Sequence, residues 1–265
     1  MFPCLINTQQ IILKLQFVFF CFILFNPVSG IAQSDDNHFR KFLNIGGDIF
    51  TSPVHFDKDD WISLSATVSA TSLALLADDP LRSFTLDNQT PFLNSIAEID
   101  NYYHIETMLI GVVGLYTYGG IANKSSSKEL ALKLTEASVY SVLINLGIKF
   151  IAGRDRPGYS DKSTFNLFST AWENTSLPSG HSTLAFAYST VMAQEYNNFF
   201  WKFGWYSLAA LVGLARIYHD VHWFSDVILG SAIGYFTAQF VNNHKSNNPD
   251  DVILPPDLIS LRIAF

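Results

Sequence analysis

The chain is poor in cysteine and in charge. It has two cysteines among 265 residues, Cys4 and Cys21, and both lie in the first 32 residues. Residues 33–265 therefore contain no thiol for a disulfide framework. Charged side chains make up 15% of the chain, and its formal net charge is −7. This acidic balance argues against nucleic acid as a partner, because nucleic-acid binding needs a basic surface.

The first 32 residues have the pattern of a signal peptide. They hold one charged side chain, Lys14, followed by an apolar run over residues 15–25 and small residues up to Ala32. This order predicts cleavage after Ala32 and export to the cell envelope. An N-terminal anchor that is not cleaved is the alternative.

Long apolar runs dominate the rest of the chain. Several approach the roughly 20 residues that span a bilayer, and they are rich in small residues suited to close helix packing. The runs cover residues 61–77, 105–122, 134–152, 181–193, 199–217 and 223–241. They predict an all-α, membrane-embedded bundle of about five to six helices within a domain at residues 61–242. A soluble domain with apolar core helices remains the alternative, because a few charges interrupt the runs.

The segments on either side of this domain are polar. Residues 33–60 show no clear helical period and are expected to form an external N-terminal arm or lid. Residues 243–265 are expected to form a C-terminal tail. Within it, residues 259–265 alternate apolar and polar side chains as a β-strand does, but one short segment cannot close a membrane barrel.

Three short segments in the C-terminal half carry a concentrated set of functional groups. They are Lys149-Phe-Ile-Ala-Gly-Arg-Asp-Arg156-Pro157, Pro178-Ser179-Gly180-His181, and Arg216-Ile-Tyr-His-Asp-Val-His222-Trp-Phe-Ser-Asp226. Arginine and lysine bind phosphate oxygens, and arginine does so through two parallel hydrogen bonds. Together with two imidazoles and a carboxylate, these cations can hold a phosphate and attack it.

The spacing of these groups places them on helix ends. Ser179 precedes an apolar run and is predicted to be an N-cap, so that Gly180 and His181 lie in a first turn whose free N–H groups bind anions. His222 and Asp226 are four residues apart and share a helix face. The carboxylate can therefore hold one imidazole nitrogen and leave the other available for attack.

The three segments resemble the signature of the type 2 phosphatidic acid phosphatase (PAP2) superfamily, Lys-x6-Arg-Pro, Pro-Ser-Gly-His and Ser-Arg-x5-His-x3-Asp. The resemblance covers roughly residues 140–240. One position departs from it, because Ala215 stands where the family has serine. This departure concerns the fine positioning of the phosphate and the rate, and leaves the reaction class unchanged.

The resemblance implies a role for each matching residue. His222 would be the nucleophile that forms a phosphohistidine, Asp226 would fix its tautomer, and His181 would protonate the leaving oxygen and then activate water. The implied phosphate-binding residues are Lys149, Arg156, Ser179, Gly180 and Arg216. No cofactor or metal is implied, and the sequence has no cysteine cluster or two-metal carboxylate array.

The implied partners are a membrane and a phosphorylated lipid. Phosphatidic acid, phosphatidylglycerol phosphate, isoprenyl pyrophosphate and lipid A phosphates remain open as substrates, because the motifs address the phosphate and not the tail. The oligomeric state is left open too. The alternatives are a soluble secreted acid phosphatase, a vanadate-dependent haloperoxidase and a non-catalytic membrane scaffold.

The distribution of lysines predicts an orientation in the membrane. Residues 123–133 hold Lys124, Lys128 and Lys133 against one acid, so they are expected in the cytoplasm. Alternating helices then place all three motifs on the external, periplasmic face. Residues 78–104 are expected outside as well, so that after signal cleavage residues 61–77 would lie along the interface or on the bundle. Labelling residues 78–104 from outside intact cells would test this topology.

Overall fold

The computed structural model describes residues 35–103, 105–160 and 163–244. The predicted signal peptide and almost all of the predicted tail, including residues 259–265, lie outside the described residues. The chain divides into two compact units, residues 1–48 with 246–265, and residues 49–245. In the first unit the described residues belong to helix α2 (Asp35–Thr51), which ends in the second unit. Residues 33–60, in which the sequence analysis found no clear helical period, therefore contain a helix, and their role as an external arm or lid stays a prediction.

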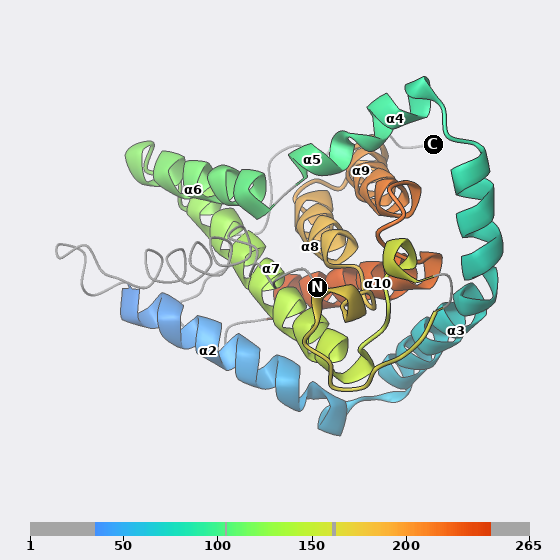
Figure 1. The fold of residues 1–265 in the computed structure, drawn as a ribbon. Helices are drawn as coiled ribbons and strands as arrows, with labels where there is room; N and C mark the ends of the chain where they lie inside the picture. The colour runs from blue at the N-terminus through green and yellow to red at the C-terminus, as the bar shows by residue number, and fades with distance from the viewer. Residues whose placement is uncertain (1–34, 104, 161–162, 245–265) are drawn as a thin grey trace, which may run out of the picture. The chain divides into compact units, whose positions relative to one another are not determined.

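The second unit is all-helical, as predicted (Figure 1). It begins with the short 3-10 helix η1 (Ser52–His55). The six apolar runs then correspond to six helices, which are α3 (Lys58–Asp87), α6 (Ile105–Ile121), α7 (Ser125–Ala152), α8 (Gly180–Gln194), α9 (Phe199–Tyr218) and α10 (Phe224–Asn243). Between α3 and α6 lie α4 (Pro91–Ala97) and α5 (Ile99–Tyr102), and between α7 and α8 lie the 3-10 helices η2 (Pro157–Tyr159) and η3 (Trp172–Asn174). Three of these helices, α3, α7 and α10, are long and apolar enough to cross a membrane.

Helix α3 is longer than its apolar run. It starts at a capping box, in which the Asp57 side chain accepts from the N–H groups of Asp59 and Asp60. It then continues through Pro80 to Asp87, because Asp78 and Arg82 form ion pairs with distant residues. Asp78 is buried in its ion pair, although most of residues 79–99 are exposed, and the external placement of residues 78–104 stays a prediction.

Close contact between α8 and α10 fixes the centre of the unit. A Cβ atom at Gly230 would lie 2.5 Å from the Ser179 carbonyl oxygen, and one at Gly234 would lie 2.1 Å from that of Thr183. Only glycine, which has no Cβ, lets the two backbones approach this closely. The N–H of Ser179 also donates to the Asp226 carbonyl at 2.9 Å. The N-termini of α8 and α10 are thereby held side by side.

Candidate active site

The N-terminus of α8 has the predicted cap. The Ser179 side chain accepts from the N–H of Ser182, and both Ser179 and Ser182 are fully buried. Gly180 and His181 occupy the first turn, where backbone N–H groups have no intrahelical acceptor. Both residues are half-buried. A Cβ atom at Gly180 would have only one neighbour, the Asn145 amide oxygen at 3.9 Å. The turn can therefore receive an anion.

The residue that ends α7 has a left-handed backbone conformation, and the chain turns there toward α8. Gly153, with φ +54°, donates its N–H to the Lys149 carbonyl at 3.0 Å. A Cβ atom at Gly153 would lie 1.7 Å from the Asn166 carbonyl oxygen, so the turn requires glycine for its conformation and for space. The next residues carry Arg154 and Arg156 into the interior, where both are buried.

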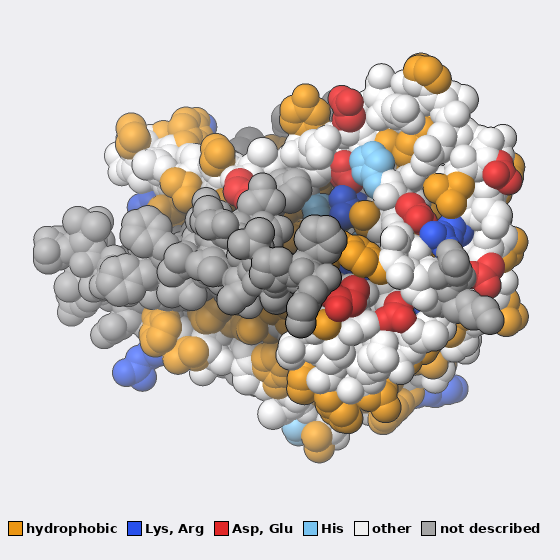
Figure 2. Space-filling view, in the orientation of Figure 1, with side chains coloured by type: hydrophobic (Ala, Val, Ile, Leu, Met, Phe, Trp, Pro, Cys, Tyr) orange, Lys and Arg blue, Asp and Glu red, His pale blue; other side chains and the backbone are white. Residues whose placement is uncertain are grey.

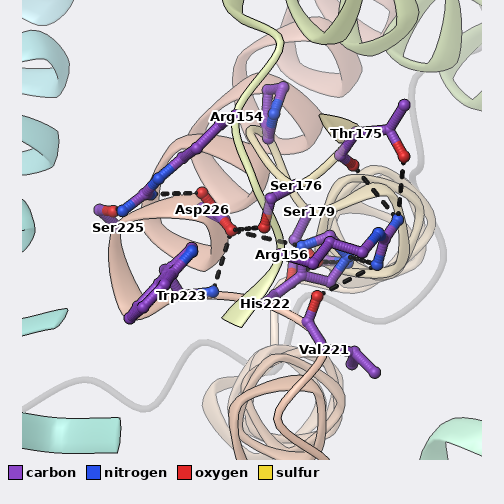
Figure 3. Close-up of polar contacts among 12 residues, drawn as sticks. Arg154, Arg156, Thr175, Ser176, Ser179, Val221, His222, Trp223, Ser225 and Asp226 are labelled. Atoms are coloured by element: carbon purple, nitrogen blue, oxygen red, sulfur yellow. Dashed lines mark hydrogen bonds and ion pairs between the residues drawn. The ribbon is translucent and has the colours of Figure 1, made fainter. Parts of the chain in front are cut away.

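Arg156 lies against the predicted nucleophile (Figure 3). Its Nη1 is 3.4 Å from His222 Nε2 and donates to the Val221 carbonyl at 3.1 Å. Arginine has only donors, so the Nε2 that faces it carries the lone pair. His222 Nδ1 lies 3.4 Å from Asp226 Oδ2, an acceptor, so Nδ1 carries the proton. This tautomer leaves the Nε2 lone pair on the side of the arginine.

The Asp226 carboxylate is fully buried and fully hydrogen-bonded (Figure 3). Its Oδ2 accepts from the Ser176 hydroxyl at 2.5 Å and from the Trp223 N–H at 2.9 Å, in addition to its contact with His222. Its Oδ1 accepts from Arg154 Nη1 at 2.6 Å. The carboxylate is thereby fixed in position, which is what a group that orients an imidazole needs.

Arg154 is the most important group that the sequence did not indicate. It is fully buried and bridges two carboxylates, with Nη1 2.6 Å from Asp226 Oδ1 and Nη2 2.6 Å from Asp78 Oδ2. Ser225 completes the network, since its N–H and its hydroxyl both donate to Asp78, at 2.8 and 2.6 Å. Asp78 lies on α3, so this network ties α3 to the start of α10. Asp78 and Arg154 are 76 residues apart in the chain, so no local sequence pattern could indicate that they pair.

Lys149 binds backbone rather than side chains. Its Nζ donates to the carbonyls of Thr175, Ser176 and Pro178 at 2.6, 3.2 and 2.5 Å. These contacts hold the segment that leads into α8. Asn145, one turn earlier on α7, donates to Thr183 at 2.9 Å. The structure therefore brings Lys149 to the predicted site, and its direct contact with a phosphate stays a prediction.

Arg216 approaches from the C-terminal end of α9. Its Nη1 donates to Asp100 Oδ2 at 2.6 Å, and the same oxygen lies 3.0 Å from His219 Nδ1. Arg216 Nε is buried and has no hydrogen-bond partner among the described residues. Its positive charge acts on His222, Lys149 and Arg156. Asp100, on α5, is another contributor that the sequence did not indicate, and it contacts both Arg216 and His219.

The cations and the burial together keep His222 neutral. Burial is the main cause that lowers the pKa of His222 well below its usual value of 6.5, and the positive charges of Arg156, Lys149 and Arg216 lower it further. Burial, followed by the charge of Arg216, lowers the pKa of Arg156 to about 10. At neutral pH the imidazole is thus uncharged, and an anion would relieve the repulsion among the cations around it.

Comparison with known proteins agrees with this geometry. Residues 130–249 match the sequence model of the PAP2 superfamily. Over this segment the chain is similar to the PAP2 superfamily. The matched PAP2 segment contains all three motifs, whereas Asp78 and Asp100 lie outside it. Ala215, which replaces the family serine, is buried, and its carbonyl accepts the N–H of His219 at 2.9 Å.

The PAP2 resemblance extends to a curated relative and to two solved structures. Lipid A 1-phosphatase of Porphyromonas gingivalis is 28% identical over 181 residues, 65% of this chain, and the chain spans 36% of that relative's length. The structure of Aquifex aeolicus LpxE matches with a TM-score of 0.51 and 21% identity over 62% of this chain and 94% of its own. The transmembrane PAP2-type phosphatidylglycerolphosphate phosphatase of Bacillus subtilis matches with a TM-score of 0.51 and 20% identity over 78% and 92%.

Proposed function

We propose that this protein is a phosphatase that hydrolyses phosphomonoester or pyrophosphate groups of membrane lipids through a phosphohistidine. The observation that carries the proposal is the orientation of His222. Its Nδ1 faces the fixed carboxylate of Asp226, and its Nε2 faces Arg156. A neutral imidazole held in this way is a nucleophile, and the neighbouring cations suit a phosphate.

The proposed reaction has two steps. In the first, the lone pair of His222 Nε2 forms a bond to phosphorus, and the bond to the leaving oxygen breaks as His181 donates a proton to that oxygen. In the second, His181 removes a proton from water while the water oxygen attacks phosphorus. The bond between phosphorus and Nε2 then breaks, and inorganic phosphate leaves. Arg156, Arg216 and the first-turn N–H groups of α8 would stabilise the charge on the phosphate oxygens in both steps.

A lipid substrate is favoured by the membrane character of the chain. Three of the described helices can cross a membrane by length and composition, and two of the proteins named above are a lipid A 1-phosphatase and a phosphatidylglycerolphosphate phosphatase. Lipid A 1-phosphate and phosphatidylglycerol phosphate are therefore the first substrates to try, ahead of phosphatidic acid and isoprenyl pyrophosphate. A soluble aryl phosphate tests the alternative of a general acid phosphatase.

The deciding experiment is phosphate release by the purified protein in detergent, with EDTA present. We expect release from at least one lipid phosphate and its loss in His222→Ala. The matched control is His244→Ala, which removes a histidine that follows the C-terminal end of α10. Acid-labile phosphate trapped on the wild-type protein would identify the phosphohistidine. Activity that survives in His222→Ala would assign the nucleophile to another residue.

An external, periplasmic site after signal cleavage is also proposed, and α3 provides its test. Arg82 and Asp78 connect the C-terminal half of α3 to the site. If α3 spans the membrane, Lys58 at its start lies on the side opposite the site. A cleaved signal and an external site would then be incompatible. The test is a chain in which both natural cysteines are replaced and Asp59→Cys is introduced. We expect a reagent that cannot cross the membrane to label this cysteine from outside intact cells. A cysteine that is protected from the reagent would refute this topology.

A further inference from the structure

The segment at residues 163–176 folds back along the end of α7. The backbone hydrogen bonds that hold it include those from Asp155 N to the Thr164 carbonyl at 3.0 Å, from Asn166 N to that of Gly153 at 2.8 Å, and from Ser176 N to that of Arg154 at 2.9 Å. We name residues 163–176 the strap. It is a well-anchored part of the fold.

The strap exposes apolar side chains where α7 ends. Phe165, Leu167 and Phe168 are 47%, 66% and 63% exposed, beside Phe150 and Ile151 of α7 at 45% and 54%. We name these five residues the apolar tip. Figure 2 shows further hydrophobic side chains on the lower part of this face, where Figure 1 draws η1 and the start of α3. A contiguous exposed apolar group of this kind marks an interaction surface.

The conformation of Phe168 indicates that this exposure is built into the fold. Phe168 has φ +61°, a left-handed backbone that a bulky residue rarely adopts. Its N–H donates to the Ile151 carbonyl at 3.3 Å, and its ring packs edge-on against Phe150 with the centroids 5.6 Å apart. Such strain concentrates at functional sites. Here it joins the strap to the exposed face of α7, one of the candidate membrane spans.

Polar groups at the base of the tip are internally satisfied. The Asp155 carboxylate accepts from Asn166 at 2.8 Å and also from Thr164 and Asn174. A carboxylate covered by donors can lie next to a low-dielectric medium at a lower cost than an unpaired one. This arrangement suits lipid on the far side of the tip.

The other end of the strap forms a wall of the site. The Trp172 ring lies over the Arg156 guanidinium at 4.1 Å, and the Glu173 carbonyl accepts the Arg156 N–H at 2.8 Å. Lys149 Nζ contacts the carbonyls of Thr175 and Ser176. One short segment thus contacts the phosphate-binding cations and carries the apolar tip.

We propose that the apolar tip inserts into the leaflet in which α7 ends and thereby brings lipid phosphates at the headgroup level to Arg156 and His222. The occupant is the acyl-chain region of that leaflet. A bilayer is favoured over a protein partner because the tip is continuous with the exposed face of a candidate span. The catalytic consequence rests on the proposed function, whereas the insertion can be measured without it.

Depth of insertion is measured by spin labelling. In the full chain with Cys4→Ser and Cys21→Ser, a nitroxide is placed at Leu167→Cys or, as the control, at the exposed Thr170→Cys of the same strap. In vesicles of phosphatidylethanolamine and phosphatidylglycerol, the label at 167 should collide with oxygen more than with a nickel chelate, and the label at 170 should show the reverse. Equal nickel access at both positions overturns the proposal. Shielding from both reagents with spin–spin broadening also overturns it, because it identifies a second copy of the chain as the occupant.

Activity gives the second readout. In Ile151→Ser/Leu167→Ser, kcat/KM for lipid phosphate in vesicles should fall about tenfold and that for a soluble aryl phosphate should change by less than about twofold, because only the first depends on apolar insertion. Ile121→Ser, at the far end of α6, is the matched control for loss of an exposed apolar side chain. Equal loss on both substrates, or loss on neither, contradicts the proposal. If the wild type hydrolyses nothing, the proposed function fails, and the spin-label depths still decide the insertion.

Discussion

The contact between Gly230 and Ser179 predicts that one added methyl group will damage the site. In Gly230→Ala the new Cβ would lie 2.5 Å from the Ser179 carbonyl, 3.1 Å from the Thr183 hydroxyl and 3.2 Å from the Ser179 nitrogen. Real Cβ contacts lie above 3.0 Å, so α8 and α10 must separate by about 0.5 Å or more. Ser179 caps α8, and α10 carries Asp226. The separation therefore acts between the two halves of the proposed site.

The expected cost has two parts. Forcing a methyl group into a close-packed contact destabilises a protein by about 1–3 kcal/mol. A misplacement of about 1 Å can cost about a hundredfold in rate, so about 0.5 Å is expected to cost about tenfold in kcat/KM. The control is Gly204→Ala on α9, where a Cβ meets nothing within 4 Å, and which should be neutral or slightly stabilising because alanine favours helix.

The assay combines thermal unfolding in detergent with phosphate release well below the unfolding temperature. We expect a lower midpoint for Gly230→Ala and a reduced kcat/KM at temperatures where the protein is still folded. Unchanged stability together with unchanged activity would refute the claim that the α8–α10 contact sets the site. A lower midpoint with normal kcat/KM would show that the contact stabilises the fold without positioning the catalytic groups.

Three further predictions follow from the charges. Arg154→Met leaves two buried carboxylates without their cation and should cost about 3–5 kcal/mol in the free energy of unfolding, and Asp78→Asn, measured by the same denaturation, should recover part of that loss in the double variant. Because the pKa of His222 is lower in the folded protein than in the unfolded chain, its contribution to stability should be complete above about pH 6.5 and should fall as the pH drops toward the folded pKa. In His222→Gln, this part of the dependence of the unfolding free energy on pH should be lost. Asp100→Asn removes the ionic partner of Arg216 and should lower kcat/KM by about tenfold with lipid phosphates, whereas an unchanged value would show that Arg216 needs no anchor.

The sequence was sufficient to predict most of the helices and the meeting of the three motifs. The Ser179 cap and the four-residue spacing of His222 and Asp226 are local features, so they could be predicted from neighbouring residues alone. The apolar runs located six helices, because burial in protein or lipid selects continuous apolar stretches. The catalytic roles of these residues stay predictions.

Other features depend on contacts between residues far apart in the chain. The first apolar run of the predicted domain ends at residue 77, yet α3 continues through Pro80 to Asp87. The acidic composition of residues 78–104 could not indicate that Asp78 and Asp100 are buried in ion pairs with distant arginines. Helix α2 was missed although Phe42, Ile45 and Ile49 recur three and four residues apart, as apolar residues do on one face of a helix.

The bridge from Asp78 through Arg154 to Asp226 determines when the site can form during folding. The carboxylate on α3 is synthesised well before its arginine, and Asp226 emerges last, so the bridge closes only after nearly the whole described chain has been made. A fragment limited to residues 130–249 would contain every motif and would leave the positive charge of Arg154 only partly compensated. Such a fragment would carry the residues of the proposed site without the carboxylate of α3 that helps to hold Arg154 against Asp226.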